Sequence, residues 1–164
     1  MFDEIVDRDR LSEPITAQIV LEILKALNYI HRHKIAHRDI KAENILVREE
    51  KDHYVVKVID WGLGDLTGAT ELSRKCGTPE YCAPEVLSGT YNLSCDMWSL
   101  GVLVYVMLSG YMPFKGKDMK ETLLRAKTGF IDFSLQAWKD RSVLCKDFLI
   151  RLIERDPSKR MTAS

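Results

Sequence analysis

This sequence of 164 residues lacks the features that mark membrane, secreted or nucleic-acid-binding proteins. Its longest apolar stretch runs from Leu100 to Leu108, far short of the roughly 20 residues that a membrane-spanning helix needs. The N-terminus alternates acidic and basic side chains and has no signal-peptide character. Because 24 basic side chains balance 24 acidic ones, charge gives no reason to expect nucleic acid or an anionic membrane as the main partner.

Cysteine is scarce, and its spacing matches no zinc-binding signature. The four cysteines are Cys76, Cys82, Cys95 and Cys145. Since nothing in the sequence suggests secretion, we expect reduced thiols and an intracellular, cytoplasmic location. We interpret His31, His33 and His53 as surface or structural residues without a metal.

The residues that are present predict one soluble domain, because 46% are apolar and 29% are charged. Between Ile15 and His33 apolar residues recur at helical spacing, which predicts an amphipathic helix with Pro14 in its first turn. The stretch from Asp96 to Leu108 is apolar nearly all round, which predicts a buried central helix that ends at Gly110.

The remaining elements complete a mainly α-helical domain with one small hairpin. Short β-rich runs at 45–47 and 54–59 flank a charged turn, as in a hairpin. Residues 60–82 are rich in glycine and show no period, which predicts a long loop of the kind that is usually functional. Two further helices are expected near 118–126 and 142–154.

Three short motifs stand in order along the chain: HRDIKAEN at 37–44, DWG at 60–62 and APE at 83–85. Each tripeptide alone occurs by chance in many proteins. Together, in this order and at these spacings, they resemble the signature set of the protein kinases. The resemblance covers nearly all of the chain and implies the C-terminal lobe of a eukaryotic-type serine/threonine protein kinase.

The resemblance implies a role for each residue of a phosphoryl-transfer site, in which positioning and charge neutralisation matter most. Asp39 would accept or orient the proton of the attacking hydroxyl, and Lys41 would steady the transferred phosphate. Asn44 and Asp60 would hold Mg²⁺ against the phosphates of ATP, since hard oxygen ligands suit this ion. Thr78 would orient the substrate serine or threonine of the protein partner.

The nucleotide side of the site would also include Glu43, Leu46 and Ile59. Leu46 and Ile59 match apolar positions near the adenine and the phosphate-side pocket, although both could equally be core strand residues. Glu43 matches a position where basophilic kinases hold a substrate arginine, but it could instead only brace the loop.

Simpler interpretations stand beside these roles. Asp39, Asn44 and Asp60 could be turn residues, Lys41 a solvated charge and Thr78 an ordinary loop hydroxyl. The corresponding alternative function is a non-catalytic, pseudokinase-like interaction module. The intact set of residues argues against a decayed site.

Two expected structural contacts follow from the same resemblance. Asp96 would brace the backbone of the catalytic loop, although an aspartate also suits a helix N-terminus on its own. Glu85 and Arg160 would form a buried ion pair, whose loss usually costs about 3–5 kcal/mol.

Within the kinases, three segments look like the calcium/calmodulin-regulated and calcium-dependent group: residues 1–6, 110–129 and 138–164. No EF-hand loop is present, so any calcium regulation would lie outside this chain. Trp61 and Ala42 replace the usual phenylalanine and proline of their motifs. Arg38 pairs with a loop phosphate in many kinases, and Arg74 stands where that phosphate often sits. Control by phosphorylation stays open, with candidates at Thr67, Thr70 and Ser73.

The sequence has no glycine-rich loop, no VAIK-type lysine and no αC glutamate. We therefore expect residues 1–164 to be a kinase C-terminal lobe without its N-terminal lobe and final helix. Such a fragment should phosphorylate poorly by itself. The uncovered face around Leu46 and Ile59 should favour self-association.

Overall fold

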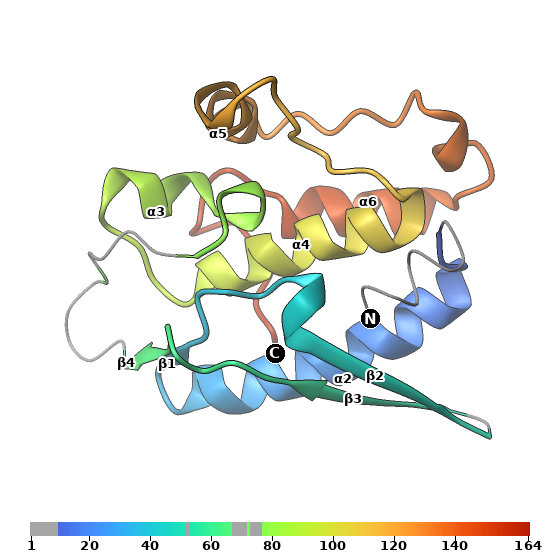
Figure 1. The fold of residues 1–164 in the computed structure, drawn as a ribbon, viewed down its shortest axis with the longest axis horizontal. Coiled ribbons are helices and arrows are strands. Elements are labelled where there is room, and N and C mark those ends of the chain that lie inside the picture. Colours follow the sequence, from blue (N-terminus) through green and yellow to red (C-terminus); the bar gives the residue numbers. More distant parts are fainter. Residues whose placement is uncertain (1–9, 52, 67–71, 73–76) are drawn as a thin grey trace.

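The computed structural model describes residues 10–51, 53–66, 72 and 77–164. Its helices are arranged around α4 (Ser94–Ser109), with α2 (Glu13–Arg32) and α6 (Val143–Leu152) packed against it (Figure 1). The expected mainly α-helical domain with a small hairpin is therefore confirmed. No helix in the described part of the chain is long and apolar enough to cross a bilayer.

Helix α2 follows from its cap and its apolar period. Ser12 caps the N-terminus by accepting a hydrogen bond from the Ile15 backbone N–H at 3.5 Å. Ile19, Ile23 and Leu27 recur at helical spacing and are fully buried. The predicted helix is confirmed, beginning two residues earlier than expected and ending at Arg32.

Helix α4 is buried on nearly all sides, as its continuous apolar sequence predicts. Gly110 ends it with φ 78°, in the left-handed region that favours glycine. Gly101 lets the chain after α6 approach closely, since a Cβ at Gly101 would lie 2.6 Å from Ile153 Cγ1. The centre of the domain therefore depends on a glycine inside a helix, where this residue is otherwise unfavourable.

The predicted hairpin is also present. Strands β2 (Ile45–Glu50) and β3 (His53–Val58) pair antiparallel, and β3 packs on α2 (Figure 1). A second pair, β1 (Ile35–Ala36) with β4 (Asp65–Leu66), was not predicted, because two residues are too short to show a period. The other elements are η1 (Ala42–Asn44), η2 (Pro79–Tyr81), α3 (Pro84–Ser88), α5 (Met119–Thr128) and η3 (Gln136–Trp138).

Polar contacts link the start of α2 to the start of α6. The Glu13 carboxylate accepts hydrogen bonds from the Ser142 backbone N–H at 2.6 Å and hydroxyl at 2.8 Å. Arg141 donates to the Leu11 and Leu108 carbonyls, both at 2.8 Å. Three helices distant in sequence are therefore fixed at one end of the domain.

Part of the predicted long loop and the first of the kinase-like segments lie outside the described residues. So do the phosphorylation candidates Thr67, Thr70 and Ser73, together with Arg74 and Cys76.

Candidate active site

The loop after β1 is held in place by a carboxylate at the start of α4. The side chain of Asp96 is fully buried. Its oxygens accept hydrogen bonds from the backbone N–H groups of His37 at 2.9 Å and Arg38 at 2.8 Å. The predicted brace of the catalytic loop is therefore confirmed. Because both bonds are to the main chain, they fix the loop backbone just before Asp39.

Asp39 is the centre of a compact hydrogen-bond network. Its Oδ1 accepts from the Thr78 hydroxyl at 2.8 Å and the Thr78 backbone N–H at 3.1 Å. Its Oδ2 lies 2.8 Å from Lys41 Nζ and accepts from Asn44 Nδ2 at 3.0 Å. Lys41 also donates to the Thr78 hydroxyl at 2.9 Å. The structure thus brings together four residues that the sequence separates by up to 39 positions.

The environment of Asp39 keeps its carboxylate ionised. Burial raises the pKa of Asp39, but hydrogen bonds from Lys41, Thr78 and Asn44 and the Lys41 charge together outweigh it. The pKa therefore lies below the ordinary value of 3.8. At neutral pH Asp39 can accept or orient a proton, as a general base requires.

Asp60 is placed beside Asn44 by the backbone. The Ile59 N–H donates to the Asn44 carbonyl at 2.9 Å, and the Ile59 carbonyl lies 3.1 Å from His37 Nε2. Asp60 adopts φ 62°, and its exposed carboxylate accepts from the Gly62 N–H at 3.3 Å. Among the described contacts, this carboxylate stays outside the Asp39 network. Next to it, Trp61 packs edge-on against His37, with ring centroids 4.6 Å apart.

The oxygens near this point suit a divalent cation. Both hydrogen bonds described for the Asn44 side chain use Nδ2, which leaves its Oδ1 as a possible ligand. The Asp60 carboxylate is exposed to solvent. An amide oxygen and a carboxylate are hard ligands of the kind that Mg²⁺ takes, with phosphate and water oxygens completing the shell. These residues therefore fit the predicted cofactor.

The other residues predicted for the nucleotide side of the site differ in burial. Glu43 lies in η1 and is exposed. Leu46 on β2 is 51% exposed, so the core-strand interpretation is wrong for it in this chain. Ile59 follows β3, is partly buried, and contributes the backbone contacts described above.

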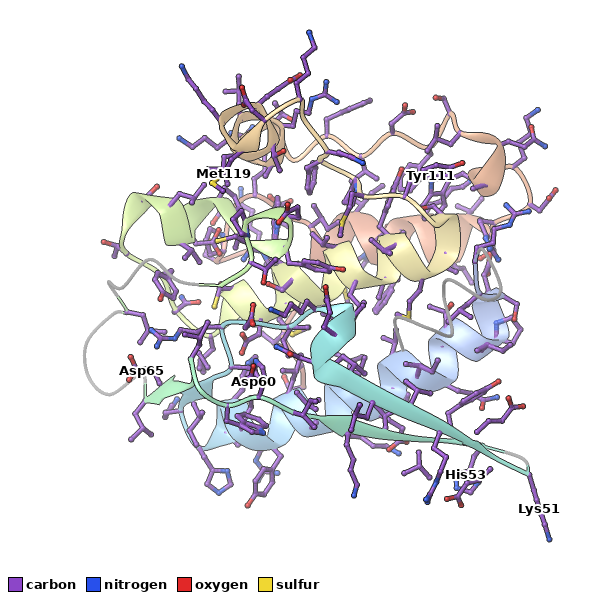
Figure 2. All side chains as sticks on the ribbon, in the orientation of Figure 1. Lys51, His53, Asp60, Asp65, Tyr111 and Met119 are labelled. Atoms are coloured by element: carbon purple, nitrogen blue, oxygen red, sulfur yellow. The ribbon has the colours of Figure 1, made fainter. Side chains whose placement is uncertain are left out.

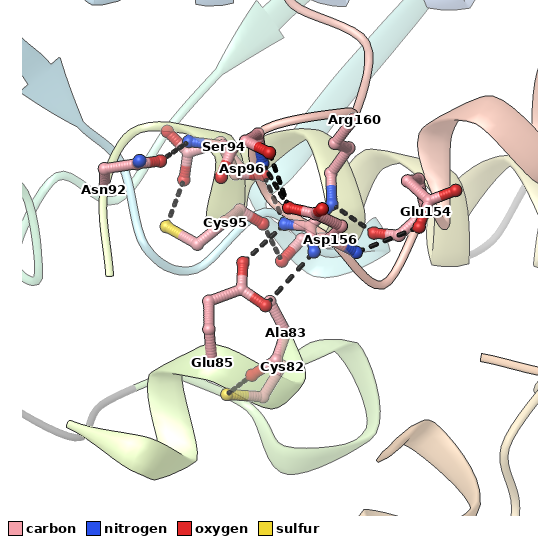
Figure 3. A network of polar contacts seen from close by, with 12 residues as sticks. Cys82, Ala83, Glu85, Asn92, Ser94, Cys95, Asp96, Glu154, Asp156 and Arg160 are labelled. Atoms are coloured by element: carbon pink, nitrogen blue, oxygen red, sulfur yellow. Dashed lines mark hydrogen bonds and ion pairs between the residues drawn. The ribbon is translucent and has the colours of Figure 1, made fainter. Parts of the chain in front are cut away.

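The segment that ends the long loop is fixed by the predicted ion pair (Figure 3). Arg160 has a fully buried side chain and forms a two-pronged ion pair with the Glu85 carboxylate. It also donates to the Ser94 carbonyl at 3.0 Å and the Glu154 carbonyl at 2.8 Å. Its guanidinium lies 5.1 Å from the centre of the Trp98 ring. The prediction is confirmed, and α3 is thereby held to the start of α4.

Sequence reasoning missed one partner of the brace. His31, on the last turn of α2, places Nε2 2.9 Å from Asp96 Oδ2. It is a structural residue, one of the two roles that the sequence left open for it. No local pattern could have revealed this contact, because 65 residues separate the pair.

Comparison with known proteins decides the family. All residues from 1 to 164 match the family model described as the protein kinase domain. The chain belongs to the protein kinase family. Its helix-rich structure is that of a kinase C-terminal lobe, as the motifs predicted.

Curated relatives show which kinases this chain is similar to. The chain is 39% identical over 166 residues to calcium-dependent protein kinase 3 of Plasmodium berghei, covering 100% of this chain and 30% of the relative. It is 39% identical over 166 residues to myosin light chain kinase A of Dictyostelium discoideum, covering 100% and 56%. Calcium-dependent protein kinase 4 of Plasmodium berghei is 37% identical over 165 residues, covering 99% and 31%.

These relatives confirm the predicted resemblance to the calcium/calmodulin-regulated and calcium-dependent group. The kinase chain spans between 30% and 56% of the length of these three relatives.

Proposed function

We propose that this chain is the substrate-binding lobe of a serine/threonine protein kinase that transfers the γ-phosphoryl group of ATP to a protein hydroxyl. The observation that carries the proposal is the Asp39 carboxylate, held ionised by Lys41, Thr78 and Asn44. Phosphoryl transfer needs such a positioned acceptor for the hydroxyl proton.

Each member of the network has a role in this chemistry. Asp39 orients the attacking serine or threonine hydroxyl and takes its proton. Lys41 places a cation between Asp39 and Thr78, where negative charge on the transferred group needs stabilising. Thr78 bridges the base and this lysine through one hydroxyl, so it defines where the substrate hydroxyl lies.

The cofactor would be ATP with Mg²⁺. When bound, the metal ion neutralises phosphate charge and aligns the γ-phosphoryl group. Asn44 and Asp60 would hold the ion, while Leu46 and Ile59 would face the nucleotide. Glu43 lies exposed at the edge of the same loop.

We infer that a second lobe completes this site, because neither a glycine-rich loop nor a VAIK-type lysine occurs in these 164 residues. The half-exposed Leu46 belongs to the face that such a lobe would cover. By itself, this chain should turn over ATP slowly and self-associate through that face. In the cell we place the kinase in the cytoplasm.

The test compares the full-length protein containing this chain with its Asp39→Asn variant. Transfer of labelled phosphate from Mg·ATP to a serine peptide is measured with and without Ca²⁺ and calmodulin. Asn keeps the shape of the side chain but cannot take a proton, so kcat should fall about 10²–10⁴-fold. The isolated chain is assayed in parallel.

Asp147→Asn serves as the control, because Asp147 is a half-exposed carboxylate on α6, paired with Arg151. It should leave the rate unchanged. An inactive full-length protein would contradict the proposal and favour the interaction module instead. Full activity in Asp39→Asn would contradict the role of Asp39 as the base.

A further inference from the structure

Residues 115–127, which include most of helix α5, carry more positive charge than the chain as a whole. Five of these residues are basic and two are acidic, which leaves a net charge of +3, whereas the whole chain is neutral. Helix α5 stands at the outer edge of the molecule, beyond α3 (Figure 1), and Met119 lies at its start (Figure 2). Four of the basic residues are exposed lysines: Lys115, Lys117, Lys120 and Lys127.

The carboxylates of this segment are engaged within it. Asp118 accepts a hydrogen bond from the Glu121 backbone N–H at 2.8 Å and so caps α5. Glu121 accepts from the Lys117 backbone N–H at 2.8 Å and pairs with Arg125 at 2.7 Å. Among the described contacts, neither carboxylate pairs with a lysine ammonium group. The charge of the four lysines is therefore left to solvent or to a partner.

Exposed cations on two other helices are paired. Lys25 on α2 lies 2.7 Å from Glu22, and Arg151 on α6 lies 2.8 Å from Asp147. Pairs of this kind bring a helix surface close to local neutrality. Unpaired lysines alone would indicate only a solvated surface, the usual environment of this side chain. The apolar residues among the lysines of α5 indicate more.

Large apolar side chains are exposed among these lysines. Met119, Leu124 and Phe130 are 62%, 63% and 72% exposed. The inner face of α5 is buried through Thr122 and Ala126. Leu124 lies on the outer face, at helical spacing from Lys120 and Lys127. Single exposed apolar residues are ordinary, but several grouped with unpaired charges indicate an interaction surface.

A groove of about 580 Å³ lies where α5 ends, between α3 and the segment after α6. Its volume falls within the range of about 300–1,000 Å³ that ligand sites have. Lys127 and Arg155 line it from two different elements. Arg155 is held there by Gly129, because a Cβ at Gly129 would overlap the Arg155 side chain.

Three carboxylates also line the groove, but each already accepts a hydrogen bond from the chain. Glu85 accepts from Arg160, Glu154 from the Asp156 backbone N–H, and Asp156 from the Ser158 hydroxyl. Lys127 and Arg155 have no partner among the described contacts. The charged groups of the groove that are still without a partner are therefore both cations.

This surface lies beside the catalytic residues. Helix α5 packs on α3 and on η2, and η2 begins directly after Thr78. The Thr78 hydroxyl donates to Asp39 at 2.8 Å. A protein whose serine or threonine reaches Asp39 therefore comes close to α5, so the substrate itself is the molecule best placed to contact this helix.

We propose that α5 and the groove at its end form a docking site for an acidic segment of the protein substrate, in which carboxylate and apolar side chains alternate. Charge complementarity identifies the occupant, since unpaired ammonium groups select carboxylates and the exposed apolar residues select apolar ones. Preferred substrates then carry two signals: basic residues before the acceptor hydroxyl and an acidic segment elsewhere. This inference rests on the proposed kinase function and names the class of its substrate.

The first experiment measures binding without catalysis. A fluorescent peptide of alternating glutamate and leucine, without serine or threonine, is titrated with the full-length protein and followed by anisotropy. It should bind about 10-fold more tightly than the same peptide with glutamine in place of glutamate. Raising the ionic strength from about 0.1 M to about 1 M shortens the Debye length from about 10 Å to about 3 Å. This change should remove the difference.

Variants locate the binding surface. Lys120→Glu combined with Lys127→Glu should abolish the preference for the glutamate peptide, and Leu124→Ser should weaken binding of both peptides. Lys139→Glu is the matched control, because Lys139 is an exposed lysine after η3 whose ammonium group also has no partner among the described contacts. It should bind as the wild type does.

The second experiment measures phosphorylation by the full-length kinase. A short serine peptide with basic residues before the serine is compared with the same peptide joined to the acidic segment by glycine–alanine linkers of several lengths. Docking tethers the substrate equally in the ground state and the transition state, so KM should fall about 10-fold at the best linker length while kcat stays unchanged. In Lys120→Glu/Lys127→Glu this gain should disappear, with both constants for the short peptide unchanged. If charge reversal lowers activity on the short peptide, Lys120→Gln/Lys127→Gln decides instead.

The outcomes are distinguishable. A wild-type protein that leaves the short peptide unphosphorylated contradicts the kinase function, while the anisotropy experiment still tests docking. Equal binding of the glutamate and glutamine peptides overturns the docking site, as does an equal KM for the short and extended substrates. A gain retained in both lysine double variants overturns its location on α5. Binding to phosphatidylserine vesicles without a preference for the glutamate peptide overturns the proposal in favour of a membrane contact.

Discussion

Replacing Asp96 by asparagine should weaken both the fold and the catalytic loop. The Asp96 carboxylate has two oxygens that face different donors. Oδ1 accepts the Arg38 N–H, while Oδ2 accepts the His37 N–H and lies 2.9 Å from His31 Nε2. Asparagine has the same shape but replaces one oxygen by an NH₂ group.

The loss of folding stability in Asp96→Asn can be estimated from this arrangement. If the asparagine NH₂ takes the Oδ2 position, it faces the His37 N–H. If the NH₂ takes the Oδ1 position, it faces the Arg38 N–H. Either orientation leaves one buried backbone donor without an acceptor, which costs about 1–3 kcal/mol. The surviving bond also loses its charge assistance. We expect the free energy of unfolding to fall by about 2–4 kcal/mol.

Urea unfolding of the protein containing this chain measures the effect, with the m-value checked for constancy. In the full-length kinase kcat should fall about 10²-fold, because Asp39 follows directly on the displaced backbone. Asp147→Asn, at an exposed pair, should change stability by no more than about 0.5 kcal/mol. A loss below about 0.5 kcal/mol for Asp96→Asn would refute the reasoning, since it would mean that the loop does not need this acceptor.

Three further perturbations test other parts of the structure. Glu85→Gln should destabilise the fold by about 3–5 kcal/mol, as measured by urea unfolding. Combining it with Arg160→Met should recover part of this loss, and additive effects would argue against a coupled pair. Burial first, then the charges of Glu43 and Glu80, raise the pKa of Tyr81 to about 12. In the unfolded chain the tyrosine hydroxyl loses its proton near pH 10.0. The stability that the protonated Tyr81 contributes below that pH should therefore be lost as pH rises toward about 12. Ultraviolet titration, with Tyr81→Phe as the control, checks this. On peptide arrays the full-length kinase should prefer basic residues N-terminal to the target, and a profile unchanged in Glu43→Ala would count against that role.

The sequence predicted well the elements whose signal is local. Helix α4 is apolar all round and ends at a glycine, and α2 repeats its apolar residues over several turns. The hairpin was recognisable because β-rich runs flank a charged turn. The family resemblance implied the brace by Asp96 and the ion pair of Glu85 with Arg160, both of which the structure contains.

What sequence reasoning missed depends on contacts between distant residues. The β1–β4 pair has two residues in each strand, too few for a period. His31 reaches Asp96 across 65 positions, and Arg38 reaches Tyr91 across 53. The Asp60 carboxylate lies outside the Asp39 network because its backbone has φ 62° and its side chain bonds to Gly62. The motif DWG alone does not predict this local turn.

The contact between Glu13 and Ser142 has a consequence for the order in which the protein is made. The two residues are 129 positions apart, and a ribosome adds about 5–20 residues per second. Glu13 therefore waits roughly 6–26 s for its partner to be synthesised. Through this time the start of α2 lacks the hydrogen bonds from Ser142, although the helix already has β3 and α4 to pack against, because both are synthesised earlier. The speed of translation, as well as the strength of the contacts, thus sets how long the N-terminal end of this helix stays without its anchor to the C-terminal part of the chain.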